Sequence, residues 1–117
     1  MGDLTSNFNR REFACKGQNC CGGGAPVSMR LVTAIQVLRD RAGRPLAVKS
    51  GFRCPKYNAG QGGNARSPHL YGTAADIAAP AGLTPRRLLI LARNTGLFDG
   101  VKLCKGGVHV EVGGLRR

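Results

Sequence analysis

SPHLYGTAAD, residues 67–76, and VHVEV, residues 108–112, hold both histidines of this 117-residue chain and two of its six carboxylates. Asp76 stands alone in a run of small apolar residues, where a buried charge has to be paired or bound to a metal. His69, Asp76 and His109 therefore form a candidate set of zinc ligands. Three protein ligands leave the fourth tetrahedral position open for water, as in catalytic zinc sites.

The second run alternates apolar and polar residues, a pattern typical of a strand, so His109 and Glu111 are expected to point to one face. Their Cα atoms would then lie roughly 6.5 to 7 Å apart. A water on a metal held by His109 would be within reach of Glu111, where a general base is needed. Pro68 and Gly72 are turn formers, and they predict a loop or a strand start around His69.

Two helices are predicted further out, over residues 28–43 and 84–96. Each begins at a hydroxyl-bearing cap, ends at a glycine and carries apolar side chains at helical spacing, which we interpret as core packing. The apolar positions include Leu31, Ile35, Leu38, Leu88, Leu89 and Ala92. A short helical turn with a capping box is expected over residues 9–13.

Strands are predicted over residues 46–50, 98–103 and 108–112, the last two paired through the turn at 105–107. Residues 51–67 are interpreted as a long irregular loop that forms a wall of the site. Because helices and antiparallel strands occur in separate runs, we predict an α+β fold, a small antiparallel sheet with flanking helices. The length suits a single domain, residues 1–117, with the Cys- and Gly-rich segment 1–24 packed on it.

The formal net charge of +12 predicts attraction to polyanions, namely nucleic acid, an anionic membrane surface or an acidic cell-wall polymer. A solvated basic surface is the simpler interpretation. Few aromatic residues and no Trp provide poorly for base stacking, so no specific nucleic-acid binding is expected. No apolar run is long enough to span a membrane, and no signal peptide is recognisable. We expect synthesis in the cytoplasm, with release by other means if the protein acts outside.

The five cysteines are Cys15, Cys20, Cys21, Cys54 and Cys104. In a reducing cytosol such residues stay thiols or bind metal. A second, structural zinc on Cys15, Cys20 or Cys21, Cys54 and Cys104 is conceivable, but the paired C-x-x-C spacing of such sites is missing. Thiols, or a disulfide such as one joining the N-terminal cluster to Cys54, are therefore favoured over a second zinc.

Four parts of the sequence carry a family resemblance, namely SGFRCP at residues 50–55, Asn58, S-x-H-x-x-G-x-A-x-D at 67–76 and HVEV at 109–112. They resemble the zinc D-Ala-D-Ala carboxypeptidase family, which includes L-Ala-D-Glu endolysins of phages. The resemblance runs from residue 13 to about residue 114. It implies a small α+β zinc fold that hydrolyses peptide bonds in peptidoglycan stems or cross-links. It further implies that His69, Asp76 and His109 bind one catalytic zinc ion.

The same resemblance gives roles to two more residues. Arg53 matches an arginine that approaches the substrate carbonyl or carboxylate, and so counts as both catalytic and substrate-binding; a guanidinium there would stabilise an oxyanion. Ser67 is implied to bind substrate or to orient a ligand. Many relatives place an acid or histidine two or three residues before the last histidine ligand, where this chain has glycines. A subgroup carries H-V-D instead, which makes Glu111 the candidate general base and Asp99 the second choice.

These observations predict a zinc metallopeptidase that acts on peptidoglycan, either a phage or prophage endolysin or a bacterial wall-remodelling enzyme. It would act at the cell wall or in the periplasm after release, or as a virion component, and as a monomer or within a phage assembly. The alternative is a catalytically inactive binding module of the same fold, favoured by the two glycines. A nucleic-acid-binding zinc protein is the third candidate, disfavoured by the few aromatic residues. Which peptide bond is cut stays open.

Overall fold

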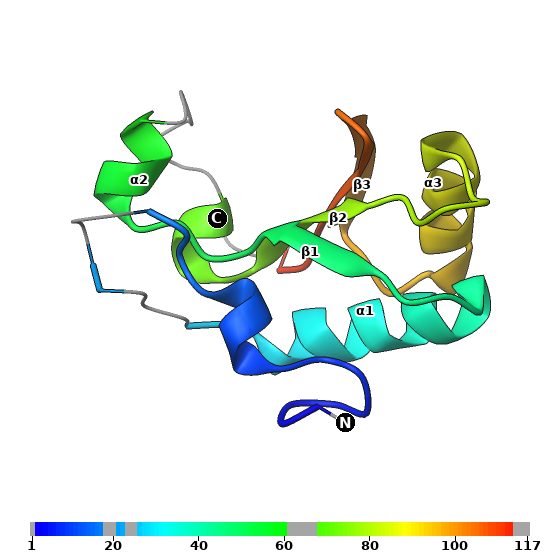
Figure 1. Ribbon diagram of the computed structural model, residues 1–117, viewed down its shortest axis with the longest axis horizontal. Coiled ribbons are helices and arrows are strands. Elements are labelled where there is room, and N and C mark those ends of the chain that lie inside the picture. Colours follow the sequence, from blue (N-terminus) through cyan, green and yellow to red (C-terminus); the bar gives the residue numbers. More distant parts are fainter. Residues whose placement is uncertain (1, 18–20, 23–25, 61–67, 114–117) are drawn as a thin grey trace.

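A four-stranded antiparallel sheet forms the centre of the computed structural model, which describes residues 2–17, 21–22, 26–60 and 68–113 (Figure 1). The strands lie in the order β1-β2-β4-β3, so the two strands that carry Asp76 and His109 are central neighbours. Their bounds are Ala47–Ser50 (β1), Ala74–Ala78 (β2), Gly100–Cys104 (β3) and Gly107–Glu111 (β4). The predicted α+β class with a small antiparallel sheet is confirmed.

Two helices, α1 (Met29–Ala42) and α3 (Pro85–Thr95), pack beside the sheet and supply seven of the fifteen buried residues of the core cluster (Figure 1). The alternating apolar side chains of β2 and β4 meet them. The fully buried residues that these four elements contribute to the core cluster are Leu31, Val32, Ile35, Leu38, Ala75, Ile77, Leu88, Ala92, Val108 and Val110. Burial of each large aliphatic side chain contributes about 1.5–3 kcal/mol. Because successive strand residues alternate, the polar residues of β2 and β4 are turned to the opposite face.

The ends of both helices follow from their caps. The Ser28 hydroxyl accepts a hydrogen bond from the Leu31 N–H at 3.4 Å, and the Thr84 hydroxyl accepts one from the Arg87 N–H at 3.1 Å. Such contacts satisfy N–H groups that have no partner within the helix. Gly43 and Gly96 end the helices with φ of 67° and 70°, a left-handed conformation that favours glycine. The helix bounds predicted from the sequence are confirmed to within one residue.

The N-terminal segment is hydrogen-bonded to the loop that follows β1 and packs closely against it. Its short 3₁₀ helix, η1 (Arg10–Phe13), has the predicted capping box, in which a Glu12 oxygen accepts from the Asn9 N–H at 2.7 Å. The carbonyl of Phe13 accepts a hydrogen bond from the Phe52 N–H at 2.8 Å. A Cβ atom at Gly51 would lie 2.7 Å from the Phe13 Cα, so a glycine is required for this approach.

Two elements differ from the sequence-based expectation. Helix α2 (Pro55–Gly60) lies within the stretch expected to be irregular, and its entry is capped by the Cys54 sulfur, which accepts from the Tyr57 N–H at 3.5 Å. Nothing in residues 74–78 indicated a strand, because alanine is depleted in strands. These residues nevertheless form β2, paired on both sides. The remainder of the predicted loop, residues 61–67, lies outside the described residues.

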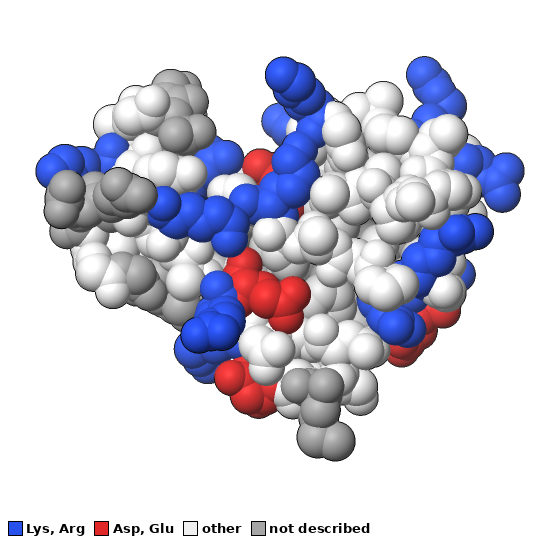
Figure 2. Space-filling model, viewed as in Figure 1, with Lys and Arg blue, Asp and Glu red and all other residues white. Residues whose placement is uncertain are grey.

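Basic side chains are spread over the face of the molecule in Figure 2, as the net charge of +12 leads one to expect. Acidic side chains occupy a much smaller part of that face. Among the described residues, none of the helices combines the length and the apolar character needed to cross a membrane.

Gly107→Ala is expected to destabilise the fold strongly. An added Cβ would lie 1.9 Å from the Ile77 carbonyl oxygen, where β4 begins its pairing with β2. Overpacking of this kind costs about 1–3 kcal/mol, and occasionally more, when the backbone has to move. The free energy of unfolding, measured by urea denaturation, reports the loss. Gly60→Ala is the matched control, because nothing lies within 4 Å of the added atom, and it should stay within about 1 kcal/mol of wild type. Equal stabilities of the two variants would contradict the close approach.

Candidate metal centre

Asp76 and His109 are directly opposite each other on β2 and β4. Both are turned away from the apolar core because their strand neighbours fill it. The distance from Asp76 Oδ1 to His109 Nδ1 is 2.8 Å. Two residues separated by 33 positions are thus brought into contact by the register of two central strands.

His69 reaches the same point from η2 (Pro68–Tyr71), the 3₁₀ turn before β2. Its Nδ1 lies 2.7 Å from the Gly51 carbonyl oxygen. Because a carbonyl only accepts, Nδ1 carries a proton, and Nε2 is the ring nitrogen that faces the centre, 3.5 Å from Asp76 Oδ1. A hydrogen bond from the other ring nitrogen to a backbone carbonyl is the usual outer contact of a metal-binding histidine. His69 is only 3% exposed, which fixes its ring.

The glycine that follows this histidine in the motif, Gly72, is required by the structure. Its φ is +69°, and a Cβ atom there would lie 2.3 Å from the Pro26 carbonyl oxygen. The Gly72 carbonyl accepts a hydrogen bond from the N–H of Ser28, the N-cap of α1. A side chain at this position would push the histidine turn away from the start of α1. Turn geometry and close packing therefore both require the glycine.

His69, Asp76 and His109 each offer a ligand atom, and these atoms all lie within 4.8 Å of one another. Two imidazoles and one carboxylate are a donor set that zinc accepts, and the hydrogen-bonded Nδ1 of His69 leaves its second nitrogen in the orientation that ligation needs. The residues present therefore fit a zinc ion. The structure brings together the three residues that were expected to be ligands.

The electrostatics favour an ionised aspartate. Burial raises the pKa of Asp76, but hydrogen bonds to His109 and His69 and the charges of both rings outweigh burial and hold it well below its usual range. For His109, burial alone would lower the pKa. The hydrogen bonds and charges of Asp76 and Glu111 outweigh burial, so the pKa of His109 is raised. A metal ion competes with the proton on His109, and its affinity therefore falls as the pH falls.

Glu111 lies beside the three candidate ligands. Its Oε1 accepts a hydrogen bond from His109 Nε2 at 2.8 Å, and the expectation that the two residues share a face is confirmed. Gly100 on β3 is its cross-strand partner, and a Cβ atom there would lie 2.9 Å from the Glu111 Cγ. The glycine thus leaves room for the glutamate to lie against β3. The other carboxylate considered as a base, Asp99, pairs instead with Arg30 of α1 at 3.2 Å.

Arg53 also reaches the centre. Its Nη2 lies 3.3 Å from Asp76 Oδ2, its Nε donates to the Ser50 hydroxyl at 3.1 Å, and its backbone N–H donates to the His69 carbonyl at 3.0 Å. A cation is therefore held next to the candidate ligands, and the guanidinium side chain is only 18% exposed. Ser67, expected to touch substrate or a ligand, lies outside the described residues.

The two glycines before His109 have structural reasons. Gly106 has a φ of +75° in the turn between β3 and β4, and Gly107 has no room for a side chain against β2. Acid–base chemistry has to come from elsewhere in this chain, and Glu111 is a carboxylate that contacts His109 and is not one of the three candidate ligands.

Three features that shape the candidate metal centre were not expected from the sequence: the Gly51 carbonyl, the Ser50 hydroxyl and the space left by Gly100. Ser50 and Gly51 belong to the SGF string that carried the family resemblance. The sequence therefore marked these two residues without indicating what they do. Gly100 gave no signal, because its importance depends on which residue faces it across the strands.

Comparisons with known proteins bear on the family and the fold. The family model described as Peptidase M15 matches residues 6–111. The crystal structure of the L-Ala D-Glu endopeptidase ChiX of Serratia marcescens is similar, with a TM-score of 0.56, 21% sequence identity and coverage of 75% of this chain and 81% of that one. At this identity, the likeness shows a shared fold. Among curated proteins, none matches the sequence.

Proposed function

Since this chain belongs to the peptidase M15 family, we propose that it is a zinc-dependent peptidase that cleaves peptide bonds in the stems or cross-links of peptidoglycan. One observation carries the proposal. Two histidines and an aspartate from separate segments converge within 4.8 Å, with a glutamate in hydrogen-bond contact with one of them. Three protein ligands and an adjacent carboxylate are what hydrolysis at zinc requires.

The zinc ion would be held by His69, Asp76 and His109. When bound, it would supply Lewis-acid chemistry, polarising a peptide carbonyl and lowering the pKa of a water molecule. Outer contacts orient the ligands: the Gly51 carbonyl holds the tautomer of His69, and Arg53 contacts the second oxygen of Asp76.

Proton transfer falls to Glu111. Its carboxylate would accept a proton from the attacking water and return it to the leaving amine nitrogen, so the residue ends the cycle as it began. Arg53 would face the negative charge that develops on the carbonyl oxygen. Its guanidinium has five N–H donors, of which the contacts to Ser50 and Asp76 engage two. A donor held in place before the reaction stabilises such charge without reorganisation.

We propose the L-Ala–D-Glu bond of the stem peptide as the first bond to test, because the similar solved structure is that of an L-Ala D-Glu endopeptidase. The net charge of +12 supports a substrate embedded in an anionic envelope, since a basic surface raises the local concentration of the enzyme there. Action at the cell wall after release, as an endolysin, or from within a virion is part of the same proposal.

Digestion of purified peptidoglycan tests the proposal. We expect new soluble peptides that begin at D-Glu, together with glycan fragments that retain L-Ala, identified by mass spectrometry. A control sample treated with a chelator should release neither product. Release of D-Ala alone would show that the activity is that of a carboxypeptidase and not of an endopeptidase. Absence of any product with a metal-loaded protein would favour an inactive binding module, against which the contact between Glu111 and His109 argues.

A further inference from the structure

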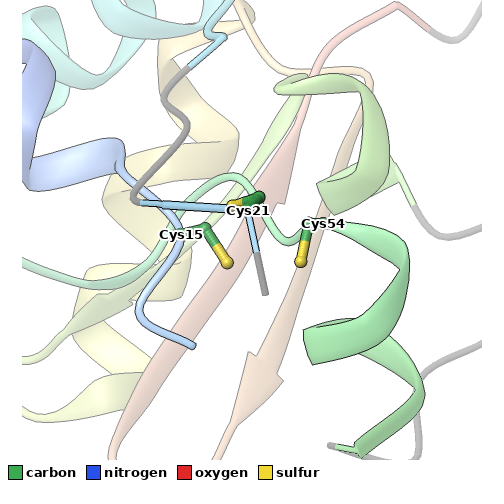
Figure 3. Close-up of side chains that lie close together, drawn as sticks. All are labelled: Cys15, Cys21 and Cys54. Carbon is green, nitrogen blue, oxygen red and sulfur yellow. The ribbon is translucent and has the colours of Figure 1, made fainter. Parts of the chain in front are cut away.

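A second cluster of metal-binding side chains lies where the N-terminal segment meets the loop after β1. The hydrogen bond between Phe52 and Phe13 sets these two stretches side by side. Cys15 follows Phe13 by two residues and Cys54 follows Phe52 by two, so the same pairing brings two thiol groups together. Figure 3 shows Cys15 on the segment after η1, Cys54 at the entry of α2, and Cys21 close to both.

The sulfur atoms of Cys15, Cys21 and Cys54 all lie within 4.8 Å of one another. Cys15 and Cys54 are buried, at 6% and 5% exposure, whereas Cys21 is exposed and closes the cluster from the solvent side. The Cys54 sulfur also accepts the backbone N–H of Tyr57. It thus has the kind of outer hydrogen bond that orients metal ligands.

We propose that Cys15, Cys21 and Cys54 bind a structural zinc ion, separate from the centre of His69, Asp76 and His109. Thiolate sulfur is a preferred ligand of zinc, and three sulfurs with one further ligand complete a tetrahedron. The three thiol protons pass to solvent as the ion binds, and no oxidant is needed. A disulfide would use two of the sulfurs and leave the third without a role, so the geometry favours the metal.

The sequence alone favoured thiols or a disulfide over a second zinc, because the cysteines lack paired C-x-x-C spacing. The structure supplies the pairing through the backbone contact between Phe13 and Phe52 instead of through spacing along the chain. Cys104, the remaining described cysteine of the expected four-thiolate set, lies at the end of β3 and is not in the cluster. Burial and the charge of Asp76 raise the pKa of its thiol, which disfavours a metal-binding thiolate there.

Zinc at this position would hold the N-terminal segment against the loop that carries Arg53. Cys54 follows Arg53 directly, and the Arg53 N–H donates to the His69 carbonyl. The ion would therefore stabilise a stretch that has little regular secondary structure, as structural metals do in small domains. This role is independent of the proposed peptidase activity.

Cobalt substitution tests the proposal without an activity assay. Protein purified with reduced thiols and titrated with Co²⁺ should develop a near-ultraviolet charge-transfer band from sulfur to cobalt, saturating at one equivalent. The centre of His69 contains no sulfur and gives no such band, so His69→Ala should keep it. Cys15→Ser, Cys21→Ser and Cys54→Ser should each abolish or strongly weaken the band. Cys104→Ser, the matched control, removes a thiol outside the cluster and should keep it.

Zinc analysis gives a second readout, with two ions expected per wild-type chain and one per Cys15→Ser or Cys54→Ser chain. Reduced wild-type protein that shows no charge-transfer band overturns the proposal, whether or not the variants fold. A band that survives in all three cluster variants overturns it as well, as does a Cys15→Ser or Cys54→Ser chain that binds as many zinc ions as wild type.

Discussion

Replacing His69 by alanine is expected to remove one zinc ion per chain and to abolish peptidase activity together. The imidazole supplies one of three ligand atoms, and it is buried and oriented by the Gly51 carbonyl. Two remaining ligands hold zinc weakly, and chemistry that depends on the ion is lost with it, a fall of about three orders of magnitude or more. Metal analysis and peptidoglycan digestion of the same sample measure both effects.

The variant will also be less stable, since the Gly51 carbonyl loses its hydrogen-bond donor at a cost of about 1–3 kcal/mol. Circular dichroism therefore has to show that the chain is folded under the assay conditions. Tyr71→Ala is the matched control in the same turn, because that side chain is 63% exposed, and it should retain the metal. A folded His69→Ala protein with full zinc content and wild-type turnover would rule out His69 as a ligand.

The helices and most strands could be predicted because their signals are local. Hydroxyl caps, closing glycines and apolar spacing lie within the elements themselves, and α1 and α3 have them all. Strand β2 has no such signal, since its alanines form a strand only through pairing with β1 and β4. Helix α2 was missed because its six residues contain two weak helix formers, an asparagine and a glycine, and its cap is a cysteine sulfur.

The candidate ligands could be named from the sequence because the chain has only two histidines and because Asp76 stands alone in an apolar run. Their contact, however, depends on the register of β2 and β4, which no local pattern specifies. The same holds for the contribution of Gly100, which depends on Glu111 being its cross-strand partner. The cysteine cluster is the clearest case, because its members are joined by a backbone contact between segments about 40 residues apart.

Glu111→Gln is expected to keep the zinc ion and to lose turnover. Glutamine has nearly the same shape, so it can still lie in the space beside Gly100 and accept a hydrogen bond from His109. It cannot take a proton from water, and removing a general base costs about 10²–10⁴-fold in rate. Initial rates on purified peptidoglycan, together with metal analysis, separate this loss from loss of the ion.

Two further variants decide whether the carboxylate itself is responsible. Glu111→Asp keeps the acid on a side chain shorter by one methylene, so it should recover part of the activity that Glu111→Gln loses. Asp99→Asn removes the other carboxylate considered as a base, and turnover should persist because Asp99 pairs with Arg30, whereas Glu111 contacts His109. Wild-type turnover in Glu111→Gln, with loss in Asp99→Asn, would transfer the role to Asp99. Because Gly107 leaves no room for a side chain, a third protein base at that position is sterically excluded.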